Sequence, residues 1–356
     1  MSNTIEQTVA DIPRQQRTEV SEAVRTRWDS LTKPRGSLGL LEDEIVKLAE
    51  IQGNAMPRTG RRGIYTFCGD HGITEEGVSL YPSVVTREMV KNFGRGGAAI
   101  NVLCRHLGIE PCIVDAGVSG PKLTGILDRR IGSGTANFLR GPAMSRAQAL
   151  SSIEAGIEIA RNAATRFDVV GLGEMGIGNT TSASALLCVF TGATPAEAAG
   201  RGAGLDDAGV QHKCRVLTAA LAAHQVDPQD PLSVISAFGG FEIAMMAGLL
   251  LGAASCRLPV VLDGFVSGAA FLIARAFYSD IENHVFFAHH SAEHGHARLL
   301  GSVRSKPLLH LGMRLGEGTG AALAIGLLSS AADLYREMAT FAEAAVSDVN
   351  GKESIK

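Results

Sequence analysis

The segment DVVGLGEMGIGNTTSASALLCVF, residues 168–190, decides the fold. It begins with a short apolar run, Asp168–Gly171, which predicts a buried β-strand. It ends in Thr180–Phe190, which has the length and composition of a helix. The loop between them is rich in glycine. A strand, a glycine-rich loop and a helix in this order are typical of a parallel sheet covered by helices.

Similar apolar runs recur along the chain and alternate with helix-like segments. The other expected strands are Gly63–Cys68, Pro111–Val114, Pro259–Leu262, His284–Ala288 and Pro307–Leu311. The expected helices include Val84–His106, Arg146–Arg166, Asp206–Ala223 and Phe241–Ser255. This alternation predicts an α/β fold, in which a parallel, Rossmann-like sheet has helices on both faces.

The two ends of the chain differ from its middle. Residues 1–60 and 320–356 read as helical, and the C-terminus ends in a polar tail. We expect both ends to form one small helical domain beside a large α/β domain, residues 61–319, that carries the active site.

Composition narrows the class of protein. Hydrophobic residues make up 46% of the 356 residues and charged residues 19%, as in a globular protein. The net charge of −3 without a dense basic stretch argues against nucleic-acid binding. The longest uncharged runs, Ile243–Cys256 and Gly318–Ala332, are shorter than the roughly 20 residues of a membrane span. A polar N-terminus and six cysteines without a CxxC pair favour a cytoplasmic protein.

The segments that follow the six expected strands share one chemical character. Each is rich in glycine or carries a polar group, and four place an Asp or Glu within the first few positions. Ligands of parallel α/β sheets bind at the carboxyl ends of the strands. The sequence therefore predicts a catalytic cleft at this edge.

The loop GEMGIGNTT, residues 173–181, is the best candidate for a phosphate site. Gly176 and Gly178 allow close backbone approach, and Asn179 and Thr180 begin a helix whose free N–H groups attract anions. A capped helix without a ligand is the plain alternative. Gly171, Gly173 and Gly176 also fit the dinucleotide pattern GxGxxG. Glu197, however, follows a helix, whereas that pattern needs an acidic residue after a second strand.

Three further segments offer candidate ligand groups. Lys213 lies in an expected helix after the glycines of GRGAG, which include Gly202, and could supply a cation for a phosphate. His290 and His294 have the spacing of zinc ligands, but no third ligand is evident, so we expect no metal. Asp263 stands alone in PVVLDGFVSG, where diphosphate-sugar loops carry paired acids. A magnesium–pyrophosphate substrate is therefore not favoured.

Taken together, these segments resemble one enzyme family. The matching pieces are LTKPRGSLGLLE (31–42), DHGITEEGVSLYP (70–82), GPAMSRAQA (141–149), GLGEMGIGNTT (171–181), GGFEIAMMAGLLLGAA (239–254), PVVLDGFVS (259–267), HSAEHG (290–295) and MRLGEGTGAALA (313–324). They are similar to segments of the nicotinate-nucleotide–dimethylbenzimidazole phosphoribosyltransferases of cobalamin nucleotide-loop assembly. They occur in family order and cover nearly the whole chain.

The resemblance implies a homodimer that needs no cofactor. It transfers phosphoribose from nicotinate mononucleotide to dimethylbenzimidazole, giving alpha-ribazole phosphate and nicotinate. It makes Glu317 the catalytic base, with Glu174 beside it, and assigns the phosphate to residues 176–180 and Lys213. We also expect Gly202, Asp263, Ser291 and Leu315 to bind substrate.

The chemistry fits a carboxylate at position 317. The pyridinium of the donor leaves as a neutral ring, whereas the attacking imidazole gains positive charge unless its N–H proton is removed. Glu317 lies between Gly316 and Gly318, which leaves room for a flat aromatic base. A nicotinamide-dinucleotide oxidoreductase and a nucleotide-binding protein with a structural Glu317 remain alternatives.

The acceptor pocket is expected after the first strand, where SLYPSVVTREM places Tyr81, Val85 and Met89. Val85 and Met89 lie one helical turn apart. An aromatic ring and a thioether suit a flat apolar bicycle, which predicts tolerance of several benzimidazoles and related purines. Core or dimer contacts are the alternative role of Tyr81 and Met89.

Overall fold

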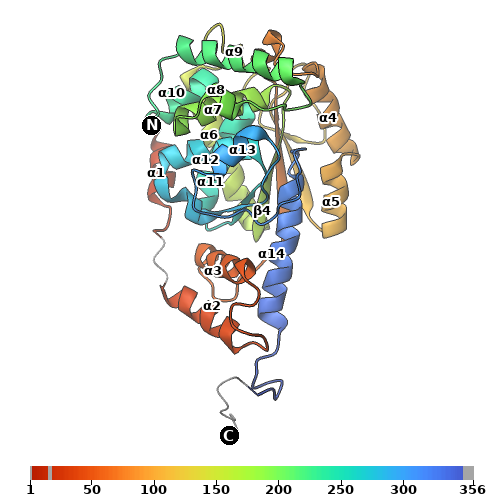
Figure 1. Cartoon of the computed structure of the whole chain (residues 1–356), viewed down its shortest axis with the longest axis vertical. Coiled ribbons are helices and arrows are strands. Elements are labelled where there is room, and N and C mark those ends of the chain that lie inside the picture. Colours follow the sequence, from red (N-terminus) through yellow and green to blue (C-terminus); the bar gives the residue numbers. More distant parts are fainter. Residues whose placement is uncertain (1, 15–17, 348–356) are drawn as a thin grey trace.

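A computed structural model describes residues 2–14 and 18–347 of the chain (Figure 1). Its centre is a six-stranded sheet with the strand order β3-β2-β1-β4-β5-β6, in which every neighbouring pair is parallel. The strands are β1 (Arg62–Gly69), β2 (Glu110–Gly117), β3 (Leu127–Asp128), β4 (Val169–Met175), β5 (Val260–Leu262) and β6 (Val285–Phe287). This order is that of the Rossmann fold, which confirms the expected fold class.

The chain order reverses between β1 and β4, because β1 continues to β2 on one side while β4 leads to β5 on the other. A crevice opens at such a switch point outside the carboxyl ends of the strands. The sheet therefore positions a ligand site between the ends of β1 and β4.

Helices cover both faces of the sheet. The α-helices are α1 (Asn3–Ala10), α2 (Thr18–Ser30), α3 (Leu40–Gln52), α4 (Val84–Arg95), α5 (Ala99–Leu107), α6 (Arg146–Arg166), α7 (Asn179–Thr191), α8 (Pro195–Ala198), α9 (Asp207–Ala223), α10 (Pro231–Phe238), α11 (Phe241–Ser255), α12 (Phe265–Phe277), α13 (His294–Leu300) and α14 (Thr319–Glu337), with 3₁₀ turns at Gly72–Glu76 and Ser279–His284.

Alternate residues of β1 belong to two apolar cores, because successive strand side chains point to opposite faces. Tyr65 and Phe67 pack into the core shared with α6 and α11. Ile64 and Cys68 pack into the core shared with α5 and α14. Burial on both faces explains why the strands are almost continuously apolar.

Below the sheet, the N-terminal helices α2 and α3 lie beside the lower part of the C-terminal helix α14 (Figure 1). There α2 packs against α3, and α3 packs against α14. The rings of Trp28 and Tyr335 meet edge to face with centroids 5.0 Å apart. Helix α1, in contrast, packs against α6 and α11. The division into domains 1–60 with 320–356 and 61–319 stays a prediction, and residues 348–356 of the expected tail lie outside the described residues.

Two expected elements are wrong. Val84–His106 is two helices, because Gly96 has a φ of 76° and ends α4 before α5 begins at Ala99. Pro307–Leu311 forms only an isolated parallel bridge between Leu309 and His289. Pro307 has no N–H to donate to a ladder, which limits pairing at this edge. The short strand β3 beyond β2 was not expected from the sequence. Within the described residues, no helix is both long enough and apolar enough to cross a membrane.

Candidate active site

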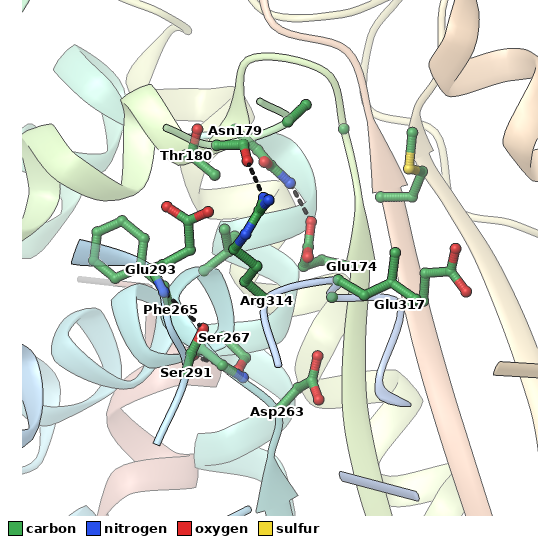
Figure 2. Close-up of a pocket in the computed structure, with 18 of the residues that line it drawn as sticks. Glu174, Asn179, Thr180, Asp263, Phe265, Ser267, Ser291, Glu293, Arg314 and Glu317 are labelled. Atoms are coloured by element: carbon green, nitrogen blue, oxygen red, sulfur yellow. Dashed lines mark hydrogen bonds between the residues drawn. The ribbon is translucent and has the colours of Figure 1, made fainter. Parts of the chain in front are cut away.

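A cavity of about 720 Å³ opens at the carboxyl ends of β1, β4 and β5. Of the residues expected at the site, Tyr81, Met89, Glu174, Gly176, Asn179, Thr180, Gly202, Asp263, Ser291, Leu315 and Glu317 line it. Figure 2 shows Glu174 between Asn179 and Glu317, with Asp263 and Ser291 below. Gly178 and Lys213 do not line the cavity. Gly178 directly precedes the lining residue Asn179, and Lys213 is hydrogen-bonded to the lining residue Thr180. The structure thus brings together segments more than 200 residues apart in the sequence.

One end of the cavity has the character of an anion site. The cradle, which we define as residues Gly176–Thr180, joins β4 to the first turn of α7. The first N–H groups of a helix lack intrahelical partners and attract anions. The Nζ of the fully buried Lys213 donates to the Oγ1 of Thr180 at 2.7 Å. Burial lowers the pKa of Lys213 to about 8, so its ammonium group is the main form at neutral pH.

Glu317 is held at the other end of the cavity in an uncommon backbone conformation. Its φ is 63°, which only a few per cent of residues other than glycine adopt. Thr66 Oγ1 donates to the carbonyl oxygen of Glu317 at 3.0 Å. Gly173 lies so close to the same carbonyl that a Cβ there would clash. These contacts fix the residue that the sequence placed between two glycines.

The Glu317 carboxylate is buried and contacts the first turn of α5. Its Oε2 accepts a hydrogen bond from the N–H of Ile100, in the first turn of α5, at 3.2 Å. Burial raises the pKa of Glu317, and the Ile100 N–H opposes this shift. A carboxylate with a raised pKa is a stronger base than one in water, as proton abstraction requires.

Glu174 lies between the cradle and Glu317. Its Oε2 accepts a hydrogen bond from the side-chain amide of Asn179. Burial raises the pKa of Glu174 to about 8, and the nearby Asp263 carboxylate adds to the shift. Glu174 is therefore mainly neutral at pH 7 in the ligand-free protein. A cationic ring in this cavity would favour its ionised form.

Asp263 directs its carboxylate at the start of α14. Its Oδ2 accepts from the N–H of Gly318 at 3.2 Å and its Oδ1 from the N–H of Ala321 at 3.0 Å. Burial raises the pKa of Asp263 to about 7. Because both oxygens are engaged by backbone groups, Asp263 holds the end of the 312–318 loop in place. Its expected contact with substrate stays a prediction.

Apolar side chains also line the cavity. Tyr81, Val85 and Met89 come from the segment after β1, as expected. Met175, at the end of β4, also lines the cavity, although no motif in the sequence indicates it. Tyr81 and Leu315 are about half exposed at the mouth.

Several other lining residues were missed. Phe265, Ser267, Glu293 and Arg314 line the cavity, and Arg314 Nη1 donates to the carbonyl oxygen of Gly202 at 3.1 Å (Figure 2). Each lies in a segment that matches the family pattern. A polar residue within a matching segment is therefore the signal that indicates Ser267, Glu293 and Arg314, whereas Phe265 has no such signal.

The histidines near residue 290 make contacts of their own. Ser291 N donates to His296 Nδ1 at 2.9 Å, and His290 stacks on His310 with ring centroids 4.8 Å apart. Across the described part of the chain, no three His, Cys, Asp or Glu side chains are grouped as metal ligands would be. Glu197 accepts a hydrogen bond from Thr194 in the capping box of α8, so its carboxylate caps a helix and does not follow a strand as a ribose-binding acid would.

The comparisons with known proteins agree with this architecture. The chain matches the family model described as Phosphoribosyltransferase over residues 14–346. The enzymes named nicotinate-nucleotide–dimethylbenzimidazole phosphoribosyltransferase from Desulforudis audaxviator and from Geobacter sp. (strain M21) are 49% and 48% identical, over 91% and 90% of this chain and 93% of each relative. The chain therefore belongs to the nicotinate-nucleotide–dimethylbenzimidazole phosphoribosyltransferase family.

Solved structures support the same assignment. The crystal structure of CobT from Thermus thermophilus superposes with a TM-score of 0.88 at 42% identity, covering 92% of this chain and 99% of that one. A second structure, of the phosphoribosyltransferase from the same organism, gives a TM-score of 0.87 at 41% identity and covers 94% of this chain and 100% of that one. At this identity the likeness extends beyond a shared fold.

Proposed function

We propose that this protein transfers phosphoribose from nicotinate mononucleotide to 5,6-dimethylbenzimidazole, giving alpha-ribazole phosphate and nicotinate for cobalamin biosynthesis. Family membership carries this proposal, and the placement of a buried carboxylate and an anion site in one cavity supports it. The residue roles that follow are part of the proposal.

The donor lies with its phosphate on the cradle and its ring toward Glu174. Lys213 and the first N–H groups of α7 balance the phosphate charge. The pyridinium ring of the donor carries a positive charge, which Glu174 and the other cavity carboxylates attract. This arrangement places C1′ of the ribose between the cradle and Glu317.

Transfer breaks the bond between C1′ and the pyridinium nitrogen and forms a bond between C1′ and a benzimidazole nitrogen. The bonding electrons leave with the pyridine ring, which departs with a neutral nitrogen. Glu317 takes the proton from the other benzimidazole nitrogen, so the acceptor does not become a cation. Attack opposite the leaving group converts the beta donor into an alpha product.

A product assay tests the proposal. Purified protein is incubated with nicotinate mononucleotide, with and without dimethylbenzimidazole, and both products are separated by chromatography. We expect one alpha-ribazole phosphate for each nicotinate released. Nicotinate release that does not depend on the acceptor, or no release by the folded protein, would contradict the proposal.

The acceptor binds among Tyr81, Val85, Met89 and Met175, and it is oriented mainly by Glu317. Because this surface is apolar and methionine repacks easily, the enzyme should accept several benzimidazoles and related purines. Measuring kcat/KM for a panel of bases with Tyr81→Ala and Met89→Ala tests this role. An unchanged ranking of bases in both variants would remove the segment from the acceptor pocket.

The protein is a cytoplasmic homodimer in this proposal. Large apolar side chains are exposed at Leu80, Val84 and Leu311, as on surfaces that bind another protein. All six cysteines are free, which fits a reducing compartment. Light scattering after size-exclusion chromatography should give twice the chain mass, and the mass of a single chain would contradict the dimer.

A further inference from the structure

A buried pair of ionisable side chains lies directly behind the cradle, outside the cavity. His71 follows β1, and Glu242 lies in the first turn of α11. His71 Nε2 and Glu242 Oε1 are 2.6 Å apart, and their side chains are 1% and 0% exposed. The mechanism proposed above does not use either residue.

The surroundings of the pair offer few competing hydrogen-bond partners. Glu242 Oε2 and His71 Nδ1 have no hydrogen-bond partner among the described residues. The bond between the two side chains is thus the main polar contact of each.

The side chain of His71 lies so close to the cradle that it would meet a Cβ added to either of two cradle glycines. A Cβ built on Gly176 would lie 3.4 Å from His71 Nε2, and one built on Gly178 would lie 3.3 Å from His71 Cβ. On the other side of the ring, a Cβ on Gly240 would clash with His71 Cε1. The ring therefore lies close to both Gly240 and the cradle, and its hydrogen bond to Glu242 fixes its orientation.

A buried pair of hydrogen-bonded polar side chains contributes little net stability compared with apolar packing, but it can specify a single arrangement. We propose that His71 and Glu242 are positioning residues, which hold the Gly176–Gly178 backbone in the conformation that receives the donor phosphate. The inference rests on the proposed function, because it assigns the phosphate to this loop.

Two conservative variants, Glu242→Gln and His71→Asn, test the inference. We expect the KM for nicotinate mononucleotide to rise by about 10- to 100-fold, the scale on which a misplacement of about 1 Å acts. The KM for dimethylbenzimidazole should stay near the wild-type value. The KM for nicotinate mononucleotide of the double variant should be no higher than that of the more impaired single variant, because the two residues act as one unit.

A matched control separates positioning from general stability. Asp115 pairs with Arg130 at 2.7 Å, and the Asp115 side chain is 2% exposed. Asp115→Asn should lower the Tm while it leaves the donor KM unchanged. If Glu242→Gln and His71→Asn also lower only the Tm, the pair is merely structural and the inference is wrong.

Binding of inorganic phosphate to the wild-type protein provides a test that needs neither folded variants nor turnover. The ring signals of His71 in NMR spectra should shift as phosphate binds, because the ring lies next to the cradle. Unshifted signals with saturating phosphate would contradict the inference. Shifted signals in a protein that shows no transfer would refute the proposed function and leave the positioning role standing.

Discussion

The position of Glu317 is fixed in a backbone conformation that lowers the stability of the fold. A residue other than glycine in the left-handed region is strained by roughly 1–3 kcal/mol. The strain persists because Thr66 holds the Glu317 carbonyl and Ile100 holds its carboxylate. One carboxylate oxygen is engaged by Ile100, so the other is left for the acceptor N–H.

Lys213 should control donor binding through its charge. Lys213→Met removes the ammonium group but keeps much of the apolar stem, so we expect a higher donor KM and a lower kcat/KM. Arg215→Ala, an exposed change on the same helix, is the matched control. A donor KM equal to that of the wild type would make Lys213 a structural residue.

The same side chain predicts a pH dependence. Because the pKa of Lys213 is lowered to about 8, its charge is present below that pH and is lost above it. The kcat/KM for the donor should therefore decline above about pH 8 in the wild type. A decline of the same size in Lys213→Met would show that another group titrates.

At the scale of elements, the start of α14 depends on Asp263. Asp263→Asn keeps the shape but loses one acceptor for the N–H groups of Gly318 and Ala321. We expect a loss of about 1 kcal/mol in the free energy of unfolding, as for other helix caps. The kcat should also fall, because the adjoining Glu317 loop becomes less fixed. Urea unfolding measures the change in stability, and steady-state kinetics measure the change in kcat. An unchanged kcat would show that the contacts of Asp263 with the start of α14 do not affect catalysis.

The elements that the sequence predicts best are those with strong local patterns. The helix Arg146–Arg166 has the expected bounds, because Ser145 caps one end and apolar spacing persists to the other. The sequence does not indicate the break at Gly96, because the segments on both sides of it have a helical pattern. The strand pairing of Pro307–Leu311 could not be judged locally, since it depends on how closely that segment follows β6.

The candidate site was predicted where the residues follow strand ends. Asp263 directly follows β5, and Glu174 follows the expected strand Asp168–Gly171, although β4 extends to Met175. The contact of His71 with Glu242 joins residues 171 positions apart, and no local pattern indicates it. The sequence indicates Arg314 only as a member of a segment that matches the family. Its bond to Gly202 depends on two loops meeting across the cavity.

At the scale of the whole molecule, the cavity concentrates buried acids. The pKa of Glu174 is raised from its ordinary 4.5 to about 8, so the folded state holds this proton more tightly than the unfolded state. The stability contributed by this protonated group is fully present below about pH 4.5 and is lost as the pH rises through about 8.

Thermal unfolding of the ligand-free protein should report this loss. Between about pH 5 and pH 8.5, the Tm of the wild type should fall relative to that of Glu174→Gln, whose side chain does not titrate. Melting curves recorded in matched buffers measure the difference. A constant difference across this range would contradict a raised pKa for Glu174.

The most direct test of the catalytic role of Glu317 is a single-turnover comparison of the wild type with Glu317→Gln. Both proteins, shown to be folded by circular dichroism, are saturated with nicotinate mononucleotide and dimethylbenzimidazole, and alpha-ribazole phosphate is followed with time. We predict that the variant forms product roughly 10²- to 10⁴-fold more slowly, the usual contribution of a positioned acid–base group. Product formation at the wild-type rate would contradict proton removal by Glu317.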